Sequence, residues 1–236
     1  MLFYEFYKLK RRYVFFLMLF LALIPCFLQS FAGYLEISIP WGVLYITGLD
    51  LFGSIIFPSM VGIVVSMMFY FDEEHQGMLP LMLCGASPKK YLWSKWAASA
   101  FICELWFLSA YLVTFLFTLK RGGSIVVVLA EQLPYLICSG AMIVLLVNLG
   151  FLWNLVFHSP LVSSLIGVLL SVLGLLLSDT FMGRVNPYGY LNRFIVFQEM
   201  EGGDFLCAGS ILILSLLFVF AMVKKEGCMG YAREKR

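Results

Sequence analysis

Six apolar stretches, each long enough to cross a lipid bilayer, constrain the fold of this chain more than any other feature. A transmembrane helix needs about 20 apolar residues to span roughly 30 Å of hydrocarbon. The stretches that meet this requirement are 13–33, 52–71, 97–119, 133–157, 160–178 and 205–223. The ten-residue alternation typical of membrane β-barrel strands is absent from the sequence. We therefore predict an all-α polytopic membrane protein with six transmembrane helices.

The composition excludes several soluble classes. The 236 residues are 62% hydrophobic and 13% charged, whereas a soluble domain carries about 25% charged residues. The net charge of +2 gives no indication of a nucleic-acid partner. The six cysteines lie in different segments without a C-x-x-C pair, so they predict neither a disulfide framework nor a metal site. No internal repeat is evident, and residues 1–236 are predicted to form a single domain.

The distribution of Lys and Arg predicts the orientation in the membrane, because cytoplasmic loops carry the excess of these residues. With the N-terminus inside, twelve of the 16 basic residues fall on the cytoplasmic side. Those on the outside are Lys120, Arg121, Arg184 and Arg193. Both termini are therefore expected in the cytoplasm, with the spans in the plasma membrane. Alternatively, residues 8–33 resemble a signal peptide, whose cleavage would leave five spans and the same C-terminal orientation.

Two segments outside the predicted spans have distinctive chemistry. Residues 1–12 combine bulky apolar side chains with a basic end and predict a short helix at the inner headgroups; a simple basic anchor is the alternative. In the loop 72–90, an acidic cluster precedes an apolar middle and terminal basic residues. Because acidic residues favour helix N-termini and basic residues C-termini, this loop predicts a short amphipathic helix. It would dock to a partner protein or rest on lipid headgroups.

Several polar or small residues fall inside the predicted spans. Glu104 lies within the third span, and an intramembrane carboxyl group is by default a functional hypothesis. It would contact a cationic substrate or relay a proton, or it would be a structural carboxyl bonded to Asn148, Asn154 or Ser139. The row Ser163, Gly167 and Ser171 has the spacing that lets helices approach closely. Such a row forms either a subunit interface or packing within the bundle.

The connections between spans also differ from one another. The turn His158-Ser159-Pro160 is very short. The predicted outer segments 34–51 and 179–204 are unusually apolar, which favours interfacial or re-entrant helices that satisfy their backbone within protein.

Motifs for catalysis are missing. No H-E-x-x-H occurs, neither His75 nor His158 is placed for an intramembrane protease, and no G-x-x-x-x-G-K-[ST] phosphate loop is present. If this protein transports a solute with ATP, another chain hydrolyses the nucleotide.

Taken together, these features resemble the ABC-2 type permeases, the membrane subunits of bacterial ABC transporters. The opening Glu5-x-x-Lys8-Leu9-Lys10-Arg11 looks like the E-x-x-K-[L]-K-R start common in these subunits. Glu74-x-x-Gly77, followed by Gly85-x-x-Pro88, Lys90 and Lys95, looks like the E-x-x-G…P…K pattern of their first cytoplasmic loop, which forms the coupling helix. Asn186-Pro187 and Tyr190 resemble the extracellular segment before the last span.

The resemblance implies a non-enzymatic transport subunit. Its partners would be two copies of a nucleotide-binding subunit, which would hold ATP and Mg²⁺, and a second permease, identical or paralogous. This chain would bind no cofactor itself. The residues implied in coupling to the ATPase are Glu73, Glu74, Gly77, Leu81, Gly85 and Pro88. The acidic run 72–74 leaves open which carboxylate has the role of the family's glutamate.

Size, span number and the N-terminus look most like the lantibiotic-immunity permeases of Gram-positive bacteria, which expel antimicrobial peptides from the producer's membrane. The cargo would then be a cationic peptide that enters from the bilayer. The alternatives are another cargo (a drug, heme, an ion or a polysaccharide), a membrane sensor or scaffold, and an intramembrane enzyme that depends on Glu104.

Overall fold

The structure is a computed structural model, and it describes residue 23 and residues 52–74, 87–120, 125–177, 186–192 and 202–233. All elements in these ranges are helical. They are η1 (Phe52–Ile56), α5 (Phe57–Glu74), α7 (Pro88–Lys120), α8 (Ile125–Phe157), α9 (Pro160–Leu176), α11 (Pro187–Asn192) and α12 (Gly202–Arg233). The predicted all-α class is therefore confirmed for the described part of the chain.

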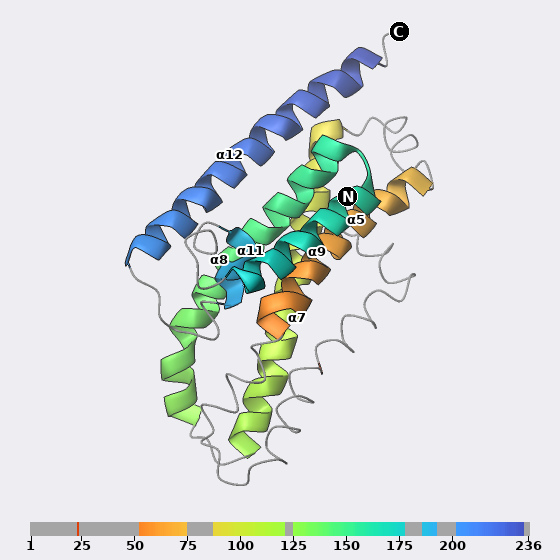
Figure 1. Ribbon diagram of the computed structural model, residues 1–236. Helices are drawn as coiled ribbons and strands as arrows, with labels where there is room; N and C mark the ends of the chain where they lie inside the picture. Colours follow the sequence, from red (N-terminus) through yellow and green to blue (C-terminus); the bar gives the residue numbers. More distant parts are fainter. Residues whose placement is uncertain are drawn as a thin grey trace.

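The long helices form a bundle in which α8 is central (Figure 1). Helix α8 contacts α5, α7, α9 and α12, while the most extensive single contact joins α5 to α9. Helix α12 lies along one side of the bundle against α8 and α7, and the short α11 packs among η1, α8 and α9. Because α8 touches every other long helix, a side chain on α8 is well placed to link them.

Three described helices contain stretches long and apolar enough to cross a membrane: Pro88–Val113, Leu136–Phe157 and Leu206–Lys225. Two further apolar helices, Phe57–Tyr70 and Pro160–Leu176, are shorter. These helices match the predicted spans 52–71, 97–119, 133–157, 160–178 and 205–223 in order. The predicted first span, 13–33, lies outside the described residues apart from position 23.

Helices α7, α8 and α12 are longer than the apolar stretches that predicted them. Helix α7 begins at Pro88 rather than near residue 97, and α12 continues beyond Lys225 to Arg233. Backbone hydrogen bonding extends a helix into polar sequence as long as no residue breaks it, so hydropathy marks the segment that lipid surrounds and not the helix ends.

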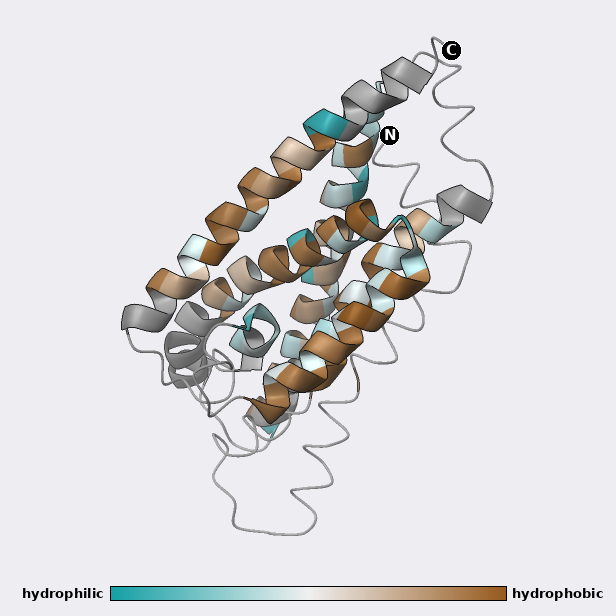
Figure 2. Ribbon diagram, turned by 45° about the horizontal axis from the view of Figure 1, so that its top comes forward, coloured by the Kyte–Doolittle hydropathy of each residue, from teal (hydrophilic) through white to brown (hydrophobic). Residues whose placement is uncertain are grey.

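The core of the bundle is apolar and aromatic. Phe52 of η1, Phe57 of α5 and Trp106 of α7 meet with ring centroids 4.7–5.6 Å apart, at distances typical of favourable ring pairs. Many large apolar side chains on α7, α9 and α12 face outward instead. Figure 2 shows this apolar character along most of α12, up to polar residues near its C-terminal end. Such outward apolar surface is expected where lipid or another subunit is the solvent.

The turn between α8 and α9 is as short as the sequence predicts. His158 has a positive φ of 49°, the left-handed conformation that commonly ends a helix, and its N–H donates to the carbonyl of Asn154 (3.1 Å). Ser159 has extended backbone and Pro160 opens α9, where proline loses no helical hydrogen bond. The two helices therefore reverse direction within two residues.

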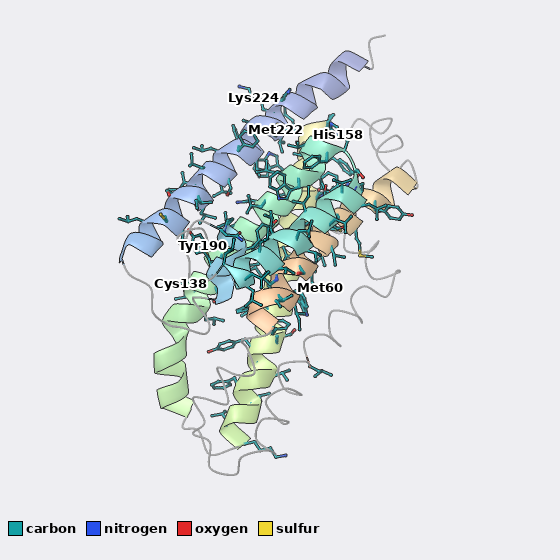
Figure 3. The ribbon with its side chains drawn as sticks, viewed as in Figure 1. Met60, Cys138, His158, Tyr190, Met222 and Lys224 are labelled. Carbon is teal, nitrogen blue, oxygen red and sulfur yellow. The ribbon has the colours of Figure 1, made fainter. Side chains whose placement is uncertain are left out.

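One end of the bundle is basic, and we call it the basic end. It carries the exposed lysines Lys89 and Lys90 at the start of α7, and Lys224 and Lys225 on α12. Helices α7 and α12 contact each other at this end, where the ring centroids of Trp93 and Phe220 lie 6.2 Å apart. Figure 3 shows His158, Met222 and Lys224 toward this end, with Met60, Cys138 and Tyr190 farther from it.

Candidate functional site

Helix α7 begins at the basic end directly after the predicted coupling segment. The Ser87 hydroxyl accepts a bond from the Lys90 N–H (3.4 Å), and the Ser87 carbonyl accepts one from the Tyr91 N–H (3.1 Å). Serine before the helix and proline at its first position are a common helix start. Pro88 is thus a helix-initiating residue.

The charge pattern of the 72–90 loop belongs to the ends of two long helices, which corrects the sequence interpretation. Residues 72–74 close α5, and Lys89 and Lys90 open α7. Acidic residues therefore stand at a helix C-terminus and lysines at an N-terminus, the reverse of the arrangement that the helix dipole favours. The sequence could not distinguish the two arrangements, because acidic residues followed by basic residues fit one short helix as well as the end of one long helix and the start of the next. The predicted short helix between them lies in 75–86, outside the described residues.

A buried lysine joins the two helices that flank this segment. Lys95 of α7 is only 2% exposed. Its Nζ lies 4.3 Å from the ring centroid of Phe69 on α5 and 5.0 Å from that of Tyr91 on α7. An ammonium over an aromatic ring is attracted electrostatically by the negative face of the ring quadrupole. Lys95 therefore links the end of α5 to the first turns of α7.

A chain of hydrogen bonds that begins at Trp96, the residue after Lys95, connects α7, α8 and α12. The Trp96 Nε1–H donates to Asn148 Oδ1 (2.7 Å), and Asn148 Nδ2 donates to the Ser215 hydroxyl (3.0 Å). Asn148 is fully buried, so both halves of its amide are satisfied inside the bundle. Interhelical hydrogen bonds of this kind each contribute about 1 kcal/mol in membrane proteins.

A second buried amide connects α8 to α5. Asn154 Nδ2 donates to the Ser66 hydroxyl (3.1 Å) and to the Gly150 carbonyl (2.8 Å). Lys95 therefore links α7 to α5, Asn148 links α8 to α7 and α12, and Asn154 links α8 to α5. All three residues lie in the half of the bundle nearer the basic end. This polar layer, defined by Lys95, Trp96, Asn148, Asn154, Ser66 and Ser215, is the candidate site for transmitting a motion of the adjacent segment.

Glu104 is not part of this layer, although the sequence analysis grouped it with Asn148 and Asn154. Its carboxyl group packs against Gly140 of α8, where an added Cβ would lie 3.6 Å from Oε2. At 1.5 Å per residue, Gly140 is about 12 Å along α8 from Asn148 and farther from Asn154. Both asparagines bond to other partners. The two asparagines are therefore not the partners of Glu104, and Ser139, the third partner that the sequence analysis named, is buried beside Gly140 on α8.

The row of small residues on α9 packs within this chain. Ser163, Gly167 and Ser171 are buried, and a Cβ at Gly167 would lie 3.4 Å from the Gly62 Cα of α5. The Ser163 and Ser171 hydroxyls donate to carbonyls one turn earlier in their own helix. The sequence left open a subunit interface or packing within the bundle, and the contacts that the structure describes for these three residues lie within the bundle.

The segment before α12 is also anchored inside the bundle. Asn186 Nδ2 donates to the Leu170 carbonyl of α9 (3.0 Å), and its Oδ1 accepts from the Tyr188 N–H (3.1 Å). A Cβ on Gly174 would lie 3.0 Å from the Gly189 nitrogen, so glycine is required for this approach. Tyr188 and Tyr190 are buried. The part of the predicted outer segment that the structure describes is therefore a short helix held by protein.

Several predicted site residues lie outside the residues that the structure describes. They are Glu5, Lys8, Lys10, Arg11, Gly77, Leu81 and Gly85, together with the side chains of Glu73 and Glu74. Within the described residues, no group of three or more His, Cys, Asp or Glu could hold a metal ion.

Sequence reasoning missed Trp96, Ser66 and Ser215 and assigned Lys95 to a loop. The Ser87-Pro88 pair was a usable signal, because it starts a helix that places Lys95 and Trp96 inside the bundle. Nothing in the sequence pairs Trp96 with Asn148, since 52 residues separate them.

Residues 1–178 match the family model described as ABC-2 family transporter protein. No curated protein and no solved structure matches the chain.

Proposed function

Since this chain belongs to the ABC-2 family of transporter proteins, we propose that it is the permease through which an ATP-driven complex expels cationic antimicrobial peptides, such as lantibiotics, from the cell membrane. The coarser part of this statement follows from the family: the chain is a multi-pass membrane protein and a permease component, and its family implies association with an ABC ATPase subunit. The direction of transport, the cargo and the coupling site are the proposed part.

In this proposal, the energy of ATP hydrolysis reaches the permease at the segment between α5 and α7. The single observation that carries it is the buried Lys95, whose ammonium contacts rings on both helices that flank this segment. A push on residues 75–87 would therefore move the ends of α5 and α7 together. The hydrogen bonds of Trp96, Asn148 and Ser215 would carry this movement to α8 and α12.

The basic end faces the cytoplasm in this proposal, and both termini lie on the same side. Support comes from the four exposed lysines that gather there, since cytoplasmic segments carry the positive excess. Two copies of the ATPase subunit would hold ATP and Mg²⁺ beneath it, and a second permease, identical or paralogous, would complete the complex. The coupling residues would be Glu73, Glu74, Gly77, Leu81, Gly85 and Pro88.

The peptide cargo rests on the resemblance to lantibiotic-immunity permeases and on charge. The predicted outer segments contain more acidic than basic residues, which suits a cationic ligand. The acidic residues are Glu36, Asp50, Asp179, Glu199, Glu201 and Asp204.

A cell assay tests cargo and coupling together. Cells that express the permease with its ATPase would be treated with a fluorescent lantibiotic, and the peptide left in the membrane would be measured. We expect less membrane-bound peptide with the native chain. The variant Glu73→Gln/Glu74→Gln should raise it to the level of cells without the permease, because the carboxylates at the coupling segment are lost.

The matched control is Glu131→Gln, the same chemical change at a carboxylate outside both the coupling residues and the acidic residues listed above, and it should clear the peptide normally. Equal membrane-bound peptide with and without the native permease would contradict the cargo. Normal clearance by the double variant would contradict the coupling site.

A further inference from the structure

Glu104 stands at the midpoint of α7, the helix that runs from Pro88 to Lys120. It lies within the stretch Pro88–Val113 that is apolar and long enough to cross a membrane. It is also the one carboxyl side chain that the described part of the structure shows. A carboxyl group at this depth is costly and needs a physical reason to be there.

Packing among the described residues does not supply that reason. The Glu104 oxygens lie over the backbone of α8 at Gly140, where an added Cβ would be 3.6 and 3.7 Å away from them. This is an ordinary van der Waals distance, and no hydrogen bond or ion pair to Glu104 is found among the described residues. The two buried asparagines of α8 bond instead to Trp96, Ser215 and Ser66. The carboxyl group therefore has contact but no polar partner in the described bundle.

The surroundings of Glu104 are apolar and open to the outside of the bundle. Phe101 and Leu108, three residues before and four after it, share its face of α7 and are 52% and 43% exposed. Leu105 beside it is 45% exposed, and Ile137, one turn before Gly140 on α8, is 68% exposed. A molecule within the bilayer could therefore reach the carboxyl group from the side, at the seam between α7 and α8.

This combination selects a class of ligand. A carboxylate surrounded by hydrocarbon is stabilised by an opposite charge that also donates hydrogen bonds. The apolar side chains around it suit the hydrocarbon part of the same molecule. A bare metal ion would need several oxygen ligands, and no group of His, Cys, Asp and Glu that could hold one lies in the described ranges.

We propose that Glu104 binds the ammonium or guanidinium group of an amphipathic cation that enters from the bilayer between α7 and α8. The inference rests on the proposed function for its cargo class and deepens it by assigning the residue that recognises the positive charge. Glu104 is a binding residue in this proposal, and it lies apart from the polar layer near the basic end.

The test uses the complete complex of permease and ATPase in lipid nanodiscs. The probe is a fluorescent long-chain primary amine, compared with its N-acetylated, neutral counterpart. We expect Glu104→Gln to weaken binding of the amine by roughly tenfold, the effect typical of losing a hydrogen bond to a charged group. Binding of the acetylated probe should be unchanged, and Glu104→Asp should retain part of the affinity for the amine.

Ser109→Ala is the matched control on α7, because the Ser109 hydroxyl donates to the Trp106 carbonyl of its own helix (2.7 Å). Assembly with the ATPase and basal ATP hydrolysis establish that each variant is folded. Equal affinity of the native chain and Glu104→Gln for the amine would overturn the inference, as would equal binding of the amine and the acetylated probe by the native chain.

Failure of this inference and failure of the proposed function give different results. If the native complex clears lantibiotic from membranes and Glu104→Gln clears it equally well, the proposed function stands and the role of Glu104 is overturned. If amine binding depends on Glu104 while no lantibiotic is cleared, the inference stands and the peptide cargo is overturned.

Discussion

Replacing Gly167 with leucine is expected to force α9 away from α5 and to lower the free energy of unfolding by about 3 kcal/mol, the upper part of the usual range for overpacking. A Cβ at this position would lie 3.4 Å from the Gly62 Cα. The neighbouring atom is backbone, which cannot rotate aside as a flexible side chain could. Because α5 and α9 form the most extensive helix pair in the bundle, the disturbance should reach the whole fold.

Gly209 provides the matched control, since nothing lies within 4 Å of an added Cβ there. Gly209→Leu on α12 makes the same chemical change and should leave stability nearly unchanged. Thermal or denaturant unfolding of the purified chain in detergent measures both variants. A stability of Gly167→Leu equal to that of Gly209→Leu would contradict the close approach of α5 and α9.

Replacing Lys95 with methionine is expected to reduce ATP-driven transport about thirtyfold while the permease still folds and assembles. Methionine fills a similar volume, and volume-conserving replacements are the buried substitutions that a fold tolerates best. It does, however, remove the contacts with Phe69 and Tyr91. Desolvated cation–π contacts are worth about 2 kcal/mol or more, and 2 kcal/mol corresponds to roughly thirtyfold in rate. Transport per ATP hydrolysed by the reconstituted complex is the measurement.

Two lysine variants serve as controls for this prediction. Lys95→Arg keeps the positive charge and the stacking on aromatic rings, so it should retain most of the transport. Lys90→Met removes an exposed charge from the first turn of the same helix and should transport normally. If Lys95→Met transports like the native chain, Lys95 does not couple α5 to α7.

The sequence predicted the helical class and the order of the apolar helices because hydropathy reports directly on the solvent that surrounds a helix. It also placed the α8–α9 turn, since only His158 and Ser159 separate two apolar stretches and proline suits the first turn of a helix. It misplaced the start of α7, because Lys89, Lys90 and Lys95 lower the hydropathy of a segment that is nevertheless helical. From its charge, Lys95 was assigned to a loop, whereas the structure shows it buried within the bundle.

The partners of the polar residues could not be predicted, because they depend on which faces of distant helices meet. Asn148 and Asn154 were recognised as polar residues in a span, but the assignment of Trp96, Ser215 and Ser66 to them requires the packing of α5, α7 and α12 around α8. The same holds for Gly167, whose spacing fits a subunit interface and internal packing equally well. Only its contact with Gly62 distinguishes the two.

The central claim is that this chain is a permease whose coupling segment, between α5 and α7, engages an ATPase, and co-purification tests it most directly. The chain would be isolated from its host in a mild detergent, with its partners identified by mass spectrometry, beside a variant with Glu73, Glu74 and Gly77 replaced. We predict recovery of an ABC ATPase with the native chain, and its loss or uncoupled hydrolysis with the variant. Recovery of the native chain without any ATPase would contradict the claim.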